Sequence, residues 1–198
     1  MMPLPSPTIP RTLKHTRAIS IAAFAREDGL WDFDAHITDH KTRDIKLASG
    51  VRPQGQALHD LHIRVTVNLQ LQIVDVEASS DAVPYPGYCE VITPDYKKLI
   101  GLNLLKQFRQ GVKERMAGVH GCTHLTELAQ ILPTAAVQAF AGDVIDTRDS
   151  ASDQAGSATQ TQPPFQLDRC HALRLDGPAV VQYYPRWAKA SPDAKSPS

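Results

Sequence analysis

Residues 58–67, Leu-His-Asp-Leu-His-Ile-Arg-Val-Thr-Val, decide the fold of this chain because apolar and polar side chains alternate along them. Successive side chains of a β-strand point to opposite faces, so this order gathers the apolar residues on one face. That face carries Leu61, Ile63, Val65 and Val67, and the other carries His62, Arg64 and Thr66. The stretch is therefore predicted to be a strand that is buried on one side only.

Three neighbouring runs have the same strand character. Residues 18–24 and 30–39 flank the turn dipeptide Asp28-Gly29, which is a strong hairpin signal. Residues 71–78 continue the series after a short turn. Four consecutive strands with short connections favour an antiparallel meander.

Helical periodicity replaces the strand pattern in the middle of the chain. Apolar residues recur every three or four positions over 99–116, which predicts a helix that ends at Gly118. A second helix is predicted over 123–140, where Pro133 is expected to kink or divide it.

The remaining segments complete the predicted organisation. Asp176-Gly177 separates two apolar runs and predicts a C-terminal β-hairpin over 170–184. Low apolar content predicts a disordered lead-in at 1–11, a flexible insert at 142–166 and a disordered tail at 188–198. The predicted fold class is α+β, an antiparallel meander followed by two packed helices and the hairpin, in a single domain at 12–187.

Composition excludes several classes of function. The 198 residues are 42% hydrophobic, which suits a globular protein, and 21 basic residues balance 21 acidic ones, so no basic field favours nucleic acid. No apolar run has the length of a membrane span, and the N-terminus lacks the pattern of a secretory signal. Three cysteines are a poor disulfide framework, so we expect a reducing cytoplasm.

The most informative chemical motif is Gly-Cys-Thr-His-Leu at 121–125, which precedes the second predicted helix. The positive end of a helix stabilises a thiolate, so Cys122 can bind a metal or act as a nucleophile with His124 beside it. The alternative is structural, with Cys122 a small buried residue and His124 a capping or surface residue. The motif by itself is compatible with both the functional and the structural interpretation.

A metal site is predicted from the soft ligands of the chain. Cys89, Cys122, His124 and Cys170 would form a tetrahedral set suited to zinc or iron, although their spacing is not that of a zinc finger.

Two strands carry further candidate residues. Asp60 and His62 share one strand face, and His59 lies on the other, so a carboxylate stands beside an imidazole. The predicted catalytic residues are Cys122, His124, His59 and Asp60; a solvated strand face is the alternative for the last two. Asp32, Asp34 and His36 alternate on one face of the strand at 30–39. This row is either the solvated side of the strand or a site for a hard cation or a basic partner. Asp39 is out of that register, so it is expected to face the core side or to lie at the strand end.

The motifs together resemble an uncharacterised bacterial family of unknown function. The resemblance rests on Arg17, Asp28-Gly29-Leu30-Trp31-Asp32, Leu58-His59-Asp60, Cys89, Gly121-Cys122-Thr123-His124-Leu125, Cys170-His171-Ala172 and Tyr184-Pro185. It implies no activity. A weaker similarity in architecture is to iron–sulfur scaffold proteins of the IscU/NifU type, in the order of Asp39, Cys89, Cys122 and His124. The Cys-Gly-Asp of those scaffolds has no counterpart here.

Three functions follow from these patterns. The first is a cytoplasmic protein with a metal- or thiol-dependent site at the sheet–helix junction, which can be an enzyme acting on a small molecule. The second is a non-catalytic metal or iron–sulfur scaffold for a partner protein, and the third is an interaction module with buried cysteines. A phosphate-binding glycine loop, a Gly-x-Ser-x-Gly elbow and a Cys-x-x-Cys pair are absent from the sequence.

Overall fold

The computed structural model describes residues 4–145, 147 and 162–189. The chain forms two compact units, Met1–Ala139 and Phe140–Ser198. Residues 4–11 are exposed and lie in neither helix nor strand. Most of the predicted insert at 142–166 and of the predicted tail at 188–198 lies outside the described residues, so their flexibility stays a prediction.

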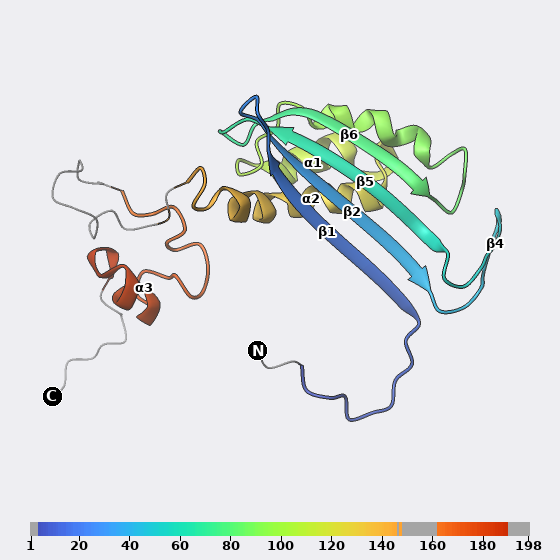
Figure 1. Ribbon diagram of the computed structural model, residues 1–198, viewed down its shortest axis with the longest axis horizontal. Coiled ribbons are helices and arrows are strands. Elements are labelled where there is room, and N and C mark those ends of the chain that lie inside the picture. The colour runs from blue at the N-terminus through green and yellow to red at the C-terminus, as the bar shows by residue number, and fades with distance from the viewer. Residues whose placement is uncertain (1–3, 146, 148–161, 190–198) are drawn as a thin grey trace. The chain divides into compact units, whose positions relative to one another are not determined.

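The first unit is built on a four-stranded antiparallel sheet, and the predicted meander is confirmed. Its strands are β1 (His15–Ala25), β2 (Trp31–Lys41), β5 (Ala57–Val67) and β6 (Ile73–Ala82), which lie side by side in that order (Figure 1). The predicted Asp28-Gly29 turn joins β1 to β2, with Gly29 at a φ of 81°. A small hairpin of β3 (Ile45–Leu47) and β4 (Gly50–Arg52) occupies the connection between β2 and β5.

The helical segments follow the sheet, so the α+β class is confirmed. They are the 3₁₀ segments η1 (Glu90–Leu99) and η2 (Gly118–His120) and the α-helices α1 (Phe108–Met116) and α2 (Thr123–Phe140). The predicted helix at 123–140 is confirmed, and Pro133 lies inside a single assigned helix. None of the helices in the described part of the chain has the length and apolar character that crossing a membrane requires.

The predicted helix at 99–116 is wrong in its first half. Gly101 adopts a φ of 88°, which right-handed helices do not contain. The backbone there instead pairs with Ile73, the first residue of β6, and with Leu71 just before it: the Gly101 N–H donates to Ile73 O at 2.9 Å, and the Leu104 N–H donates to Leu71 O at 2.9 Å. Distant hydrogen-bond partners therefore override the local periodicity, and α1 begins only at Phe108.

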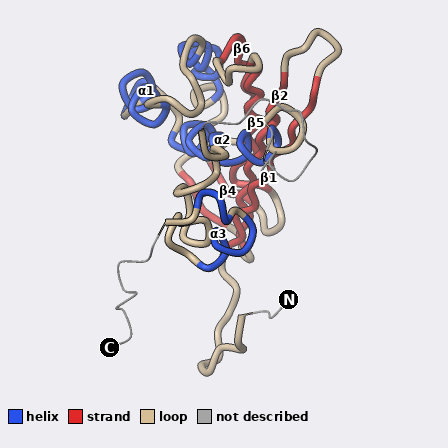
Figure 2. Tube along the Cα trace, turned by 90° about the vertical axis from the view of Figure 1, so that its left-hand side faces the viewer, coloured by secondary structure: helices blue, strands red, loops and turns tan. Residues whose placement is uncertain are grey.

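The core lies between the helices and one face of the sheet. Figures 1 and 2 show α1 and α2 on the same side of the strands. Phe33, Ile37, Leu61, Ile63, Val65 and Ile73 from the sheet, and Phe108, Val112, Leu125, Leu128, Leu132 and Ala136 from the helices, are all at most 3% exposed. These side chains occupy the period-two and period-3.6 positions that the sequence predicts. The opposite face of the sheet carries the polar side chains.

The predicted C-terminal hairpin is also wrong. In the second unit, residues 170–177 form turns and Pro178–Tyr183 form the short helix α3, followed by the 3₁₀ segment Pro185–Trp187. Pro178 stands at the first helical positions, where its fixed φ suits a helix and its missing N–H is not needed. Val180 is fully buried. The residues after the Asp176-Gly177 turn therefore continue as a helix.

Candidate functional site

Asp39 is a buried carboxylate where the sheet meets α2. It lies on the core face of β2, opposite Arg17 of β1 and His59 of β5 in the strand register. Only 1% of the residue is exposed, although the neighbouring core positions on β2 are apolar. A buried carboxylate is expensive unless it is paired and hydrogen-bonded, so its partners define the site.

Arg17 and His15 supply much of this pairing. Arg17 donates from Nε to Asp39 Oδ1 and from Nη2 to Oδ2, both at 2.9 Å, and His15 Nε2 lies 2.7 Å from Oδ1. Arg17 Nη1 also donates to Glu127 Oε2 of α2 at 2.7 Å. Burial opposes ionisation of Asp39, but the Arg17 guanidinium and then His15 hold the pKa of the carboxyl well below its usual range. The carboxylate is thus charged and fixed in orientation.

Two imidazoles converge on Asp39 Oδ2 from different elements. His59 Nδ1 of β5 lies 3.0 Å from this oxygen, and His124 Nε2 of α2 lies 3.8 Å from it. The two rings contact each other with their centroids 3.8 Å apart. Burial lowers the pKa of both histidines; His124 lowers that of His59 further, and Arg17 lowers that of His124 further. Both rings therefore favour the neutral form, which has a nitrogen lone pair free.

Cys122 lies on the far side of His124 and immediately before α2. Its sulfur is 4.0 Å from His124 Nδ1, the nitrogen that faces away from Asp39. Its carbonyl accepts the N–H of Thr126 at 2.9 Å, and the Tyr96 hydroxyl both donates to that carbonyl at 2.8 Å and accepts the Cys122 N–H at 3.0 Å. Burial raises the pKa of Tyr96 to about 12, so the hydroxyl stays protonated as this clamp requires. The Cys122 backbone is therefore fixed at the helix start.

The predicted site residues divide into those that the structure brings together and those that it does not. His59, His124 and Cys122 meet around Asp39, whereas Asp60 points to the opposite face of the sheet with His36 and His62. Cys89 is half-buried beside η1, and Cys170 is exposed in the second unit. Neither of the two His/Asp groups with metal-like spacing in the described residues includes a cysteine. The predicted set of Cys89, Cys122, His124 and Cys170 therefore stays a prediction.

Asp39 could be recognised from the sequence as an unusual acid, but its partners Arg17 and His15 could not. Asp39 stands at a strand position where the alternation predicts an apolar residue. Arg17 and His15 have no such feature in the sequence. Only the register of β1 against β2 shows that they reach this carboxylate.

Comparison with known proteins shows the family to which the chain belongs. A family model described as "Protein of unknown function (DUF2889)" matches residues 15–138, which confirms the resemblance to an uncharacterised family. The match includes the whole Asp39 site and ends before Cys170. No curated protein and no solved structure matches the chain. The similarity to iron–sulfur scaffold proteins therefore stays a hypothesis.

Proposed function

The chain belongs to DUF2889, a family of proteins of unknown function, so the family suggests no activity. We therefore propose a function from the geometry of the site. The protein binds one divalent transition-metal ion at the sheet–helix junction, through Asp39, His59 and His124. Zinc or iron is the class of ion that two imidazoles and a carboxylate select, since Mg²⁺ and Ca²⁺ prefer oxygen ligands alone.

The convergence of three ligand atoms carries this proposal. One atom from each residue lies within 4.8 Å of the other two. Bonds of about 2.0–2.2 Å to one ion allow two ligand atoms to stand up to about 4.4 Å apart. The distances of 3.0 and 3.8 Å from Asp39 Oδ2 to the two imidazole nitrogens are inside that limit.

The surrounding residues support the same function. Arg17 orients the carboxylate, as hydrogen-bonded outer partners of metal ligands do, but it also neutralises the charge, so the affinity rests mainly on the imidazoles. Cys122 faces the second nitrogen of His124 and would serve as its outer partner rather than as a ligand. Three protein ligands leave a coordination position for water or substrate, which is typical of catalytic sites.

We infer from this open position that the protein is an enzyme acting on a small molecule in the cytoplasm, where its three free cysteines would stay reduced. The rival function is a scaffold that passes the metal to a partner protein. Turnover of candidate small molecules supports the first, and transfer of bound zinc to a metal-free partner supports the second.

Zinc titration of the metal-free protein tests the junction site. We expect His59→Gln and His124→Gln each to lower the affinity of this site at least about 100-fold, since even outer partners of metal ligands are worth 10–100-fold. His120→Gln is the control, because His120 is exposed and belongs to neither group of metal-like spacing in the described residues. Isothermal calorimetry measures the affinities. Equal affinity in the wild type and both ligand variants would contradict the proposal.

A second candidate function is thiol chemistry, which the order Cys122, His124, Asp39 favours. A thiol, an imidazole and a carboxylate in series form the arrangement of nucleophile, base and orienting group. The separations of 4.0 and 3.8 Å are long, and catalytic hydrogen bonds often shorten only when substrate binds. In this function the metal is not needed.

Alkylation by iodoacetamide at pH 7 tests the thiol function. If His124 activates the thiol, Cys122 reacts at least about 10-fold faster than Cys89, and His124→Gln removes the difference. Peptide mass spectrometry of the metal-free protein measures both rates. Cys89 is the internal control, since it is half-buried like Cys122. Equal rates at the two cysteines would exclude an activated Cys122.

A further inference from the structure

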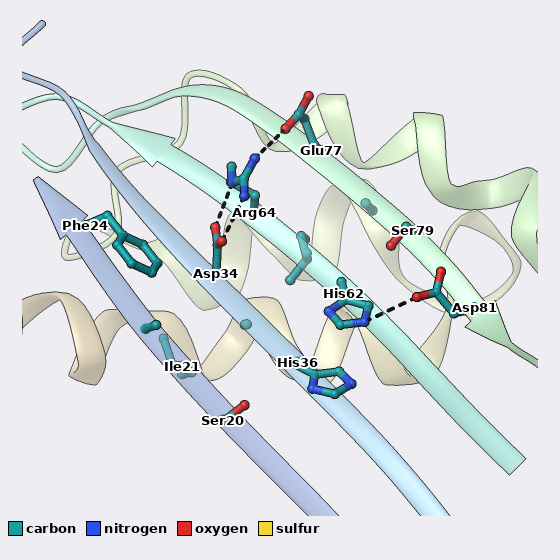
Figure 3. A pocket seen from close by; sticks show the side chains of 14 residues that line it. Ser20, Ile21, Phe24, Asp34, His36, His62, Arg64, Glu77, Ser79 and Asp81 are labelled. Atoms are coloured by element: carbon teal, nitrogen blue, oxygen red, sulfur yellow. Dashed lines mark hydrogen bonds and ion pairs between the residues drawn. The ribbon is translucent and has the colours of Figure 1, made fainter. Parts of the chain in front are cut away.

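A second cluster of imidazoles and carboxylates lies on the opposite, open face of the sheet. His36 of β2 and His62 of β5 are direct cross-strand partners. Their rings are stacked, with centroids 4.0 Å apart and planes only 5° from parallel. Figure 3 shows the two rings next to each other, with Asp81 of β6 facing His62. Directly opposed positions hold their side chains about 5 Å apart, so the strands themselves set this pair.

Both imidazoles turn the same nitrogen to one carboxylate. His36 Nε2 lies 2.6 Å from Asp60 Oδ1, and His62 Nε2 lies 3.3 Å from the same oxygen. His62 Nε2 is also 3.5 Å from Asp81 Oδ2. Three strands therefore direct two nitrogens and two carboxylates to one point above the sheet.

In the part of the chain that the structure describes, the carboxylates of this cluster lack the arginine partner that neighbouring carboxylates on the same face have. Arg64 binds both oxygens of Asp34 at 2.7 and 2.8 Å and also pairs with Glu77. Among the residues that the structure describes, Asp60 and Asp81 form ion pairs only with histidines. Imidazole carries no permanent charge, so these two carboxylates lack the fixed cation that the other acids of this face have.

A cavity of about 680 Å³ opens over the cluster (Figure 3). Its lining includes His36, His62 and Asp81, together with the hydroxyls of Ser20 and Ser79. A ligand from solvent can therefore reach the nitrogens, and water can complete a coordination shell. The histidine side chains are 36% and 43% exposed, which leaves them room to tilt out of the parallel stack so that both lone pairs meet one ion.

We propose that His36, His62 and Asp60, supported by Asp81, bind a second divalent transition-metal ion on the open face of the sheet. The ion supplies the positive charge that Asp60 and Asp81 lack, and two imidazoles favour zinc, nickel or copper over Mg²⁺ and Ca²⁺. This site shares no residue with the junction site and does not depend on it, because the sheet separates the two groups.

Zinc titration of the metal-free protein, with stoichiometry as the readout, tests this site. We expect His36→Gln and His62→Gln each to bind one equivalent of Zn²⁺ fewer than the wild type, and Asp60→Asn to weaken the same step at least about 10-fold. His40→Gln is the matched control, since His40 lies on the same strand and face as His36 but in neither metal-like group, and it should keep the wild-type stoichiometry.

The variants of the two sites separate the two proposals. Loss of an equivalent in His36→Gln but not in His59→Gln supports the open-face site even if the junction binds nothing. Wild-type stoichiometry and affinity in His36→Gln and His62→Gln overturn it. Circular dichroism establishes that each variant is folded, which is expected because both side chains are more than one-third exposed.

Discussion

Asp39→Asn is expected to lower the free energy of unfolding at pH 7 by about 3 kcal/mol, because it leaves hydrogen-bonded partners facing a neutral amide in a buried position. Asp39 contacts Arg17, His15 and His59 at 3.0 Å or less, and its side chain is 2% exposed. One-third exposure of Arg17 lets water recover part of the loss. Urea unfolding followed by circular dichroism measures the difference.

Asp34→Asn is the matched control for this variant. Asp34 also binds an arginine through both of its oxygens, from the same strand, but on the open face with 37% of its side chain exposed. An exposed pair contributes at most about 1 kcal/mol. Similar losses in the two variants would show that burial of Asp39 does not determine its contribution.

Acid should remove the difference between the wild type and Asp39→Asn. The pKa of Asp39 is lowered in the folded state, so its contribution is fully present above the unfolded pKa of about 3.9 and declines as the pH falls toward the folded value. The lowered pKa values of His59 and His124 affect stability at a higher pH than Asp39 does. The unfolded chain binds protons near pH 6.5 that the folded site resists, so stability also declines as the pH falls below about 6.5.

The fold was predictable where one local pattern agreed with one buried face. Alternation along 58–67 and the helical repeat along 123–140 correspond to β5 and α2, because in both the apolar positions face the same core. The pattern failed at 99–116, where Leu71 and Ile73 hydrogen-bond the backbone, and in the second unit, where Pro178 begins a helix. Neither set of contacts can be read from local periodicity.

The site was predictable only in part, for a related reason. The Cys122 and His124 motif was correctly placed at the start of α2. Asp39 stood out because it is an acid outside the polar register of its strand. Their meeting with His59 depends on the register of β2 against β5 and on how α2 packs, which the sequence patterns do not specify. The metal set of Cys89, Cys122, His124 and Cys170 was predicted from ligand type alone and stays a prediction, while the two groups with metal-like spacing in the described residues contain imidazoles and carboxylates.

Gly121→Ala is expected to disturb both stability and the junction site, because Gly121 lies against the backbone of Met116 at the end of α1. A Cβ there would lie 2.5 Å from the Met116 carbonyl oxygen and 3.1 Å from Thr126 Oγ1. The backbone of Gly121 is extended, with a φ of −153°, so an alanine is not strained by its own conformation. The effect is therefore purely steric, and overpacking against backbone should cost about 3 kcal/mol.

The clash in Gly121→Ala should also displace the segment that carries Cys122 and His124. Ligand geometry tolerates only small shifts, so zinc binding at the junction should weaken at least about 10-fold. Gly118→Ala is the control: its surroundings are empty within 4 Å, but its φ of 61° disfavours alanine by about 1 kcal/mol. Urea unfolding and calorimetry at a temperature where both variants are folded give the two readouts. If Gly121→Ala matched Gly118→Ala in stability and kept wild-type zinc affinity, the close approach at Gly121 would not be what positions His124.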